Sequence, residues 1–362
     1  MKIYKFITQI SIAGCMLVGT PMLQGCMDNS LNDPLGKVSE EELGRDGFAA
    51  NAFFLTLCDY AYPIATENIY NTNESLIGDC YGRYQVMATD KFKGANFATY
   101  NAPENWLNWQ FADDNVMVLT YGAWNKIKNV TQGTGVNFAW AQILRIATMH
   151  RMLDMYGALP YSQISSDKLS APYDTMEEAY HAMFTDLTDA INVMTVYVTE
   201  NPNNRTMAKY DKVYDGDFEK WVKFANSLKL RMAIRIRFAD REYARQMAEE
   251  AINHSIGVIT SNEDNATSLG TKNQLYTVLV QWPDQCVSAD ITSYMKGYND
   301  PRMSKYFKKK TSDKGDDDYV GMRAGLSYGN DITGPTFSRI NVGEMDRTLW
   351  MSAAETAFNK AE

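Results

Sequence analysis

Aromatic and amide side chains gather between residues 100 and 110, in a mixture that can hold a sugar. A sugar ring has an apolar C–H face that packs on an aromatic plane, and its hydroxyl groups need hydrogen-bonding partners such as amides. We predict that Trp106 and Trp109 are stacking surfaces for a ligand. Three further side chains lie beside them in the sequence: Tyr100, Asn105 and Asn108. The alternative is that a tryptophan here only fixes the segment to the core.

Two long stretches, residues 63–115 and 255–345, lack a sustained helical repeat. The first is rich in Asn, Gly and aromatic residues, and the second mixes Gly, Asp and Ser with short apolar pieces. Long irregular segments in a compact domain commonly carry function. They contain a second set of candidate ligand contacts: Trp282, Asp79, Arg83 and Tyr84.

Histidines and acidic residues form no recognisable catalytic motif. The three histidines, His150, His181 and His254, make no metal-binding pair such as H-E-x-x-H. A glycosidase needs two carboxylates held across a cleft, and nothing in the sequence distinguishes such a pair among the 44 acidic residues. We therefore predict a binding protein without enzymatic activity, and keep a glycan-processing enzyme as the rival.

A basic and an acidic cluster lie close together near residue 310. The acidic side chains there are Asp313, Asp316, Asp317 and Asp318. Because Ca²⁺ prefers several oxygen ligands, this cluster is a candidate calcium site, but it lacks the EF-hand spacing. We favour a solvated loop and predict no cofactor. The basic run Lys308, Lys309 and Lys310 is short, and the net charge is −9. Since phosphate backbones are held by clustered Lys and Arg, we exclude nucleic acid as a partner.

The N-terminus has the order of a secretory signal. Lys2 and Lys5 precede an apolar run over residues 6–18, and a Leu-x-Gly-Cys pattern ends at Cys26. Cleavage before Cys26 would leave a thiol that can carry lipid. The apolar run is too short to span a bilayer, which needs about 20 apolar residues. We predict a signal peptide over residues 1–25 and lipidation of Cys26, with Cys15 as the alternative lipidation site.

Helical periodicity dominates the remaining segments. Thr175 and Glu178 form a capping-box pattern at the head of a helix whose apolar residues recur every three or four positions. Asp217 can cap the next predicted helix. A helix over residues 138–156 should end at Gly157. Two more helices are expected over residues 39–62 and 241–254.

Three cysteines follow the signal region: Cys58, Cys80 and Cys286. Their spacing matches no metal motif, and three is a poor number for a disulfide framework. The sequence leaves two alternatives open. Either Cys58 and Cys80 form one disulfide, or the cysteines are buried free thiols.

The segment over residues 214–235 reads YDGDFEKWVKFANSLKLRMAIR. It resembles the SusD/RagB family, whose members carry a GD-x-x-K-W-x-K-x-A-N-S-L-x-L-R-x-A-x-R segment. Three further matches resemble the family's Y-G-x-x-P-Y turn, its D-P-R-hydrophobic segment and the start of a later helix. They lie at residues 156–161, 299–303 and 354–362. Together with the lipoprotein signal, these matches span nearly the whole chain.

The resemblance implies a mostly α fold, in which tetratricopeptide-like helix pairs support an irregular, loop-rich ligand-binding face. It also implies a lipid-anchored protein on the outside of the outer membrane, with a SusC-like TonB-dependent transporter as partner. Family members bind glycans or peptides, so we expect delivery of a glycan, or alternatively a peptide, to that transporter. The sequence does not name the ligand.

The family segment itself is predicted to be structural. Trp221, Phe224 and Leu228 fall on one helical stripe and are expected in the core. Asn226 and Ser227 are expected to bond to a neighbouring loop. Two arginines four residues apart should brace acidic loops; they are Arg231 and Arg235.

The final segment is expected to be helical, with Trp350, Ala354 and Phe358 on one face. It reaches Glu362 without a Gly, Pro or other C-cap signal, and SusD-like proteins usually continue beyond this helix. We therefore expect one SusD-like domain over residues 26–362 that lacks the family's C-terminal part.

Overall fold

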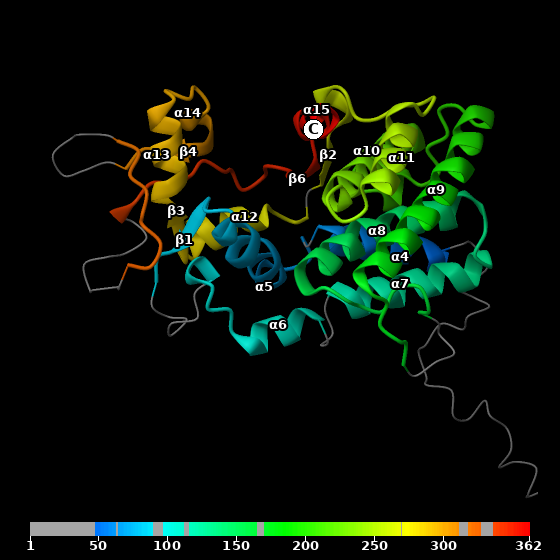
Figure 1. Cartoon of the computed structure of the whole chain (residues 1–362), viewed down its shortest axis with the longest axis horizontal. Coiled ribbons are helices and arrows are strands. Elements are labelled where there is room, and N and C mark those ends of the chain that lie inside the picture. Colours follow the sequence, from blue (N-terminus) through cyan, green and yellow to red (C-terminus); the bar gives the residue numbers. More distant parts are fainter. Residues whose placement is uncertain are drawn as a thin grey trace, which may run out of the picture. The chain divides into compact units, whose positions relative to one another are not determined.

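Helices, long and short together, form the larger part of the described residues in the computed structural model (Figure 1). The structure describes residues 48–62, 64–89, 97–111, 116–164, 170–268, 270–310, 318–326 and 336–362. Within this part of the chain no helix is long and apolar enough to cross a membrane. The predicted signal peptide, both candidate lipidation sites Cys26 and Cys15, and Asp313, Asp316 and Asp317 of the candidate calcium site lie outside the described residues.

Six helices of twelve or more residues are found in the described ranges. They are α4 (Phe48–Ala61), α7 (Val116–Thr131), α8 (Gly135–Tyr156), α9 (Met176–Glu200), α10 (Phe218–Ile236) and α11 (Arg241–Ile252). The shorter α-helices are α5 (Glu67–Tyr70), α6 (Glu104–Phe111), α12 (Gln274–Tyr276), α13 (Ala289–Gly297), α14 (Met303–Tyr306) and α15 (Ala353–Ala361). The predicted mostly α fold is confirmed.

Local capping groups fix the ends of the long helices where the sequence predicts them. The Glu178 amide donates to Thr175 Oγ1 (3.2 Å), and the Thr175 amide donates to Glu178 Oε2 (2.8 Å), which completes the capping box of α9. Asp217 Oδ1 accepts from the Lys220 amide (3.2 Å) at the head of α10. Helix α8 ends at Gly157, whose φ of +80° favours glycine.

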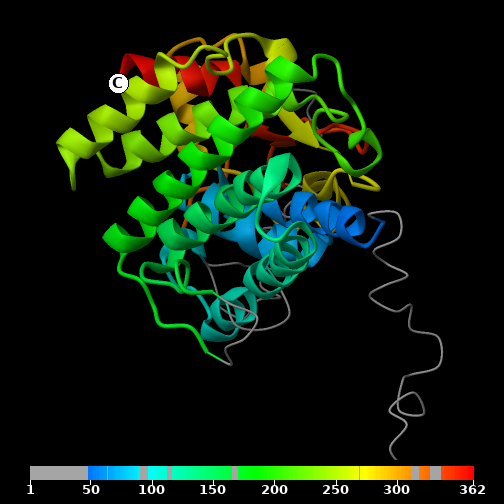
Figure 2. The ribbon, with the colours of Figure 1, turned by 90° about the vertical axis from the view of Figure 1, so that its right-hand side faces the viewer.

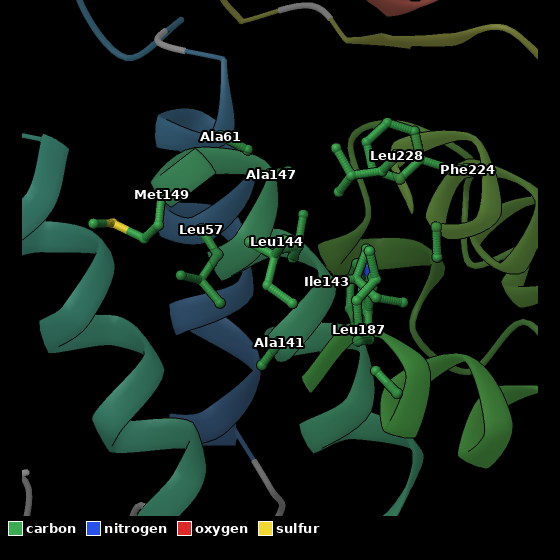
Figure 3. Packing of buried hydrophobic residues seen from close by; sticks show 14 of the residues in the cluster. Leu57, Ala61, Ala141, Ile143, Leu144, Ala147, Met149, Leu187, Phe224 and Leu228 are labelled. Atoms are coloured by element: carbon green, nitrogen blue, oxygen red, sulfur yellow. The ribbon is translucent and has the colours of Figure 1, made fainter. Parts of the chain in front are cut away.

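The long helices pack on one another around a single large core. Helix α8 packs against α7 and α9, and α10 packs against α9 and α11 (Figures 1 and 2). Side chains from four helices meet in this core, as Figure 3 shows for Leu57, Leu144, Leu187 and Leu228. These neighbouring helices fit the predicted helix pairs, while their tetratricopeptide-like geometry stays a prediction.

The family segment supplies the centre of this core. Trp221, Phe224 and Leu228 are fully buried, as predicted from their spacing. Asn226 Nδ2 donates to the Gly257 carbonyl (3.0 Å), so its predicted bond to a neighbouring segment is confirmed. Likewise, Ser227 Oγ accepts from the Ile259 amide (2.8 Å).

The two arginines of the segment bind helices and not acidic loops. Arg231 pairs with Glu355 of α15, and Arg235 Nε donates to Asp154 of α8 (2.7 Å). The prediction of loop partners is therefore wrong. Arg231 is mostly buried between α10 and α15, whereas Arg235 is exposed. The sequence spacing alone did not specify these partners.

Short strands, 3₁₀ helices and π-helices lie between the α-helices of the described chain. Three two-stranded antiparallel sheets pair β1 with β3, β2 with β6, and β4 with β5. The strands are β1 (Gln85–Met87), β2 (Ala266–Ser268), β3 (Gln285–Val287), β4 (Phe307–Lys308), β5 (Arg339–Ile340) and β6 (Thr348–Met351). Two segments are π-helices, η3 (Asn71–Asp79) and η7 (Thr277–Gln281). Three are 3₁₀ helices, η4 (Phe97–Thr99), η5 (Ala208–Tyr210) and η6 (Asn262–Asp264). All of these elements except η5 and β6 lie within residues 63–115 and 255–345, where the sequence lacks a sustained helical repeat.

Trp350 does not share a helical face with Ala354 and Phe358. It lies in strand β6, buried, and its indole Nε1 donates to Ser268 Oγ (2.8 Å) on the paired strand. Helix α15 begins only after Ser352, whose side chain caps it. The helical pattern in the sequence extended across this cap, because Trp350 is apolar in either setting.

The three cysteines are free and buried. Cys58 lies in the large core, whereas Cys80 and Cys286 lie in a second apolar cluster beside sheet β1–β3. Of the two alternatives left open by the sequence, the structure has the buried free thiols.

Candidate ligand-binding surface

An exposed pair of stacked tyrosines is the main feature of the irregular region. The rings of Tyr81 and Tyr100 are 5.3 Å apart and nearly parallel, at 20°. Tyr100 is 67% exposed, and the Arg83 guanidinium carbon lies 5.7 Å from the centre of its ring. An aromatic plane beside a cation with several N–H donors can hold both the apolar face and the polar rim of a ligand. We call Tyr81, Arg83 and Tyr100 the aromatic surface.

Tight turns present the aromatic surface to solvent. Tyr100 follows η4, where its amide donates to the Phe97 carbonyl (3.0 Å), and its φ is +59°. Arg83 follows η3 with a φ of +60°, and its amide donates to the Cys80 carbonyl (3.1 Å). Left-handed backbone at non-glycine residues is uncommon and is held by surrounding structure. Both segments are anchored, because Phe97 and Cys80 are buried in the second apolar cluster.

Trp106 lies under this surface. Its half-buried ring stacks on Phe97, with centres 5.8 Å apart and 16° between the planes. Phe97 in turn contacts the edge of Tyr81 at 6.0 Å. This placement matches the alternative in which a tryptophan fixes the segment to the core. Whether Trp106 also contacts a ligand stays a prediction.

Residues 104–111 form helix α6 and not the irregular segment that the sequence suggested. Asn105 and Asn108 are exposed on this helix. Trp109 belongs to the same helix, but its side chain lies outside the described residues. The asparagine and proline residues before α6 hid its start, because they are typical of turns.

The second set of predicted contacts is only partly brought together. Arg83 belongs to the aromatic surface, and the exposed Tyr84 follows it directly. Asp79 is instead half-buried, and its Oδ2 accepts from Gln85 Nε2 (2.8 Å). Burial raises the pKa of Asp79 to about 7. Trp282 follows η7 and is partly exposed.

Sequence reasoning missed several exposed tyrosines, among them Tyr81. Two others, Tyr294 of α13 and its C-cap Tyr298, are 69% and 77% exposed, with ring centres 5.6 Å apart. Their i,i+4 spacing was the available signal. The amide of Ser288, the cap of α13, donates to the Tyr84 carbonyl (3.0 Å). Helix α13 therefore starts beside Tyr84, the residue that follows Arg83 of the aromatic surface.

His150 of α8 is a buried titratable group. Burial lowers the pKa of His150 to about 4, and its Nδ1 lies 2.9 Å from the Ile146 carbonyl. Among the described residues, no group of three His, Cys, Asp or Glu side chains is placed to hold a metal ion.

The aromatic surface lies on irregular turns beside a helical scaffold, which is where binding residues are often found in proteins. The family model of SusD-like proteins, described as Susd and RagB outer membrane lipoprotein, matches residues 30–362. The chain therefore belongs to the SusD-like family. No curated protein matches it.

Solved structures of SusD homologues share the fold. One from Bacteroides uniformis is 36% identical with a TM-score of 0.80, and the match covers 88% of this chain and 66% of that one. A SusD-like protein from Bacteroides thetaiotaomicron is 32% identical (TM-score 0.76; 86% and 64% covered). A chitin-binding SusD homologue from Flavobacterium johnsoniae is also 32% identical (TM-score 0.76; 86% and 65% covered). The chain thus spans just under two thirds of the length of these structures.

Proposed function

We propose that this protein binds glycans at the cell surface and delivers them to a SusC-like TonB-dependent transporter. The observation that carries the proposal is the stacked pair Tyr81 and Tyr100, which leaves a large aromatic plane in water next to Arg83. Exposed aromatic planes of this kind commonly mark interaction sites.

The chemistry of the aromatic surface suits a sugar. The Tyr100 ring can pack against the C–H face of a pyranose, while the Arg83 guanidinium donates to its hydroxyl oxygens. Asn105 and Asn108 on α6 are exposed and can supply amide donors and acceptors. Trp106, Trp109, Trp282, Asp79 and Tyr84 remain proposed contacts. The chitin-binding homologue from Flavobacterium johnsoniae supports a glycan as the ligand class.

A peptide is the second candidate ligand. Exposed tyrosines are also enriched in protein interfaces, and Tyr294 and Tyr298 add to the exposed aromatic area. We propose no catalytic role and no cofactor for any residue. In this proposal, residues 26–362 form one SusD-like domain that Cys26 anchors by lipid to the outer membrane, with the aromatic surface facing the exterior.

Binding measurements on purified protein test the proposal. Titration calorimetry with a panel of oligosaccharides, including chitin fragments, and with a peptide pool should find a glycan ligand. Tyr100→Ala should weaken the binding of that ligand at least tenfold, which corresponds to about 1.4 kcal/mol of binding free energy. Phe238→Ala, a control that removes an exposed ring from the turn between α10 and α11, should not. Binding of peptides alone, or equal affinity of Tyr100→Ala and the unchanged protein, would overturn the proposal.

A further inference from the structure

A cavity of about 460 Å³ lies beside sheets β1–β3 and β4–β5. Tyr81, Arg83 and Tyr100, which form the aromatic surface, do not line it. Its volume falls within the ~300–1,000 Å³ typical of small-molecule sites. The described residues therefore form a second concave site, distinct from the aromatic surface.

A cation in this cavity has no acidic partner. Arg339 of β5 lines the cavity, is half-buried, and forms no ion pair with any acidic residue that the structure describes. Its Nη1 donates to the Leu279 carbonyl (2.8 Å), which holds the guanidinium in place. The Nε and Nη2 groups have no acceptor in the same part of the chain, and neither nitrogen is fully buried. A ligand in the cavity can therefore reach them.

Partial burial makes an anionic partner for Arg339 favourable. Burial lowers the pKa of Arg339, because the guanidinium has lost water and has gained no opposite charge from the described residues. An arginine nevertheless keeps its charge at neutral pH. The two oxygens of a carboxylate match two N–H groups of a guanidinium and form parallel hydrogen bonds with them. A ligand carboxylate would therefore offset the desolvation of this cation.

The other charged groups of the lining do not cancel the charge of Arg339. Lys305 and Arg347 are exposed and add positive charge. Asp346 is also exposed, and its Oδ2 already accepts from the Gly343 amide (2.7 Å). Burial raises the pKa of Asp79 to about 7, so this carboxyl is mostly protonated at pH 6. The cavity therefore favours an anion over a cation.

Aliphatic side chains supply much of the remaining accessible wall. Leu275, Ile291 and Ile340 line the cavity and are half-buried, so part of each side chain faces open space. Leu349 lines the cavity as well and is 52% exposed, which places it where the cavity meets solvent. An apolar ligand body would lose contact with water against these side chains, and this burial is favourable.

We propose that this cavity binds a small carboxylate with an apolar body, whose oxygens accept hydrogen bonds from Arg339 while the body packs on the aliphatic wall. Two sources present this chemistry: free apolar acids and the apolar C-terminal residue of a peptide. The cavity is a site of its own, with a selectivity that differs from that of the aromatic surface.

A matched pair of probes tests the charge of the ligand. Phenylacetate and phenylacetamide have the same body, but only the first carries a carboxylate. NMR titration at pH 6, where Asp79 is mostly protonated, should show at least tenfold tighter binding of phenylacetate. N-acetylglycylphenylalanine and its C-terminal amide form the corresponding pair for a peptide. The acid that binds more tightly, this dipeptide or phenylacetate, identifies the source.

Variants of the cavity test its location. Arg339→Met removes the cation and keeps much of its stem, so the preference for phenylacetate over phenylacetamide should disappear. Arg339→Lys keeps the charge and should retain part of the preference. Arg241→Met is the matched control, because Arg241 is exposed on α11 and does not line the cavity. If Arg339→Met folds poorly, Leu349→Trp adds bulk at an exposed position and should block both probes.

Several outcomes would overturn the cavity proposal. They are equal binding of acid and amide in both pairs, a phenylacetate preference that persists in Arg339→Met, and binding that persists in Leu349→Trp. Tighter binding of glucuronate than of either apolar acid would also overturn it, as would the absence of any binding. The effect of Tyr100→Ala on oligosaccharides does not depend on these results, so the proposed function stands or fails separately.

Discussion

Arg231 of α10 and Glu355 of α15 form a two-pronged ion pair. Arg231 Nε donates to Glu355 Oε1 (2.5 Å), and Nη2 donates to Oε2 (2.7 Å). The same guanidinium donates to the Tyr62 hydroxyl (2.6 Å) and to the Trp350 carbonyl (2.9 Å). Planar guanidinium groups suit such paired contacts. One side chain therefore ties strand β6 and helix α15 to the large core.

Breaking this pair should destabilise the protein. Glu355→Gln leaves the mostly buried arginine without its acid. Because the Glu355 side chain is itself 37% exposed, we expect a loss of about 1.5 kcal/mol in the free energy of unfolding. Urea denaturation measures it. The exposed pair of Arg245 and Glu249 on α11 provides the control, because Glu249→Gln should cost less than about 0.5 kcal/mol. A similar small effect for both variants would contradict a structural role for the buried pair.

Asp79 should make stability depend on pH. Burial raises its pKa to about 7, above the usual value near 4. The folded state therefore holds its proton more tightly than the unfolded state, and the stability gained at low pH is lost as the pH rises from about 4 to about 7. Asp79→Asn keeps a neutral acceptor for Gln85 and removes this loss.

The stability difference between Asp79→Asn and the unchanged protein should consequently grow in favour of the variant by about 2 kcal/mol from pH 5 to pH 8. Denaturant unfolding at both pH values measures it. A difference that is the same at pH 5 and pH 8 would show that the Asp79 carboxyl titrates alike in both states.

Trp106 should act as an anchor of the aromatic surface. Because its ring stacks on the buried Phe97, Trp106→Ala is expected to lower stability by about 2 kcal/mol. Trp106→Phe should recover part of this loss. Tyr100→Ala removes a mostly exposed ring and should leave stability nearly unchanged. Thermal unfolding of the three variants measures these stability losses. A loss for Tyr100→Ala as large as that for Trp106→Ala would refute the prediction.

The capping box of α9 should contribute measurably to stability. Thr175→Ala removes the acceptor of the Glu178 amide, which costs about 1 kcal/mol at an N-cap. Thr185, which is exposed within α9, provides the control, since Thr185→Ala replaces a weak helix former with a strong one. The first replacement should lower the melting temperature, and the second should leave it equal or higher.

The three thiols should be protected in the native protein. Burial raises the pKa of Cys80 and Cys286 to about 12, and it raises that of Cys58 well above its usual range. Since the thiolate is the reactive form, Ellman's reagent should modify these cysteines only after denaturation. Rapid modification of the folded protein would contradict their burial.

Residues that interact within a few positions of the chain made much of the fold predictable. Thr175 and Glu178 are three residues apart and form the capping hydrogen bonds with each other, so the start of α9 could be predicted from the sequence. Trp221, Phe224 and Leu228 recur at helical spacing, and that spacing alone directs them to one face and hence to the core. The family segment that contains these three residues is likewise a continuous stretch of sequence, so it could be recognised without the structure.

The candidate site depends on contacts between distant residues, which only the tertiary structure decided. Tyr81 stacks on Tyr100 because η3 and η4 are both anchored in the second apolar cluster, and neither tyrosine's own neighbours in sequence specify that contact. Strand β1 pairs with β3, with Gln85 opposite Val287, although about two hundred positions separate the two strands in the chain. The sequence determined which side chains are present and what chemistry they offer. Only the packing of the strands and turns determined which of them lie next to one another.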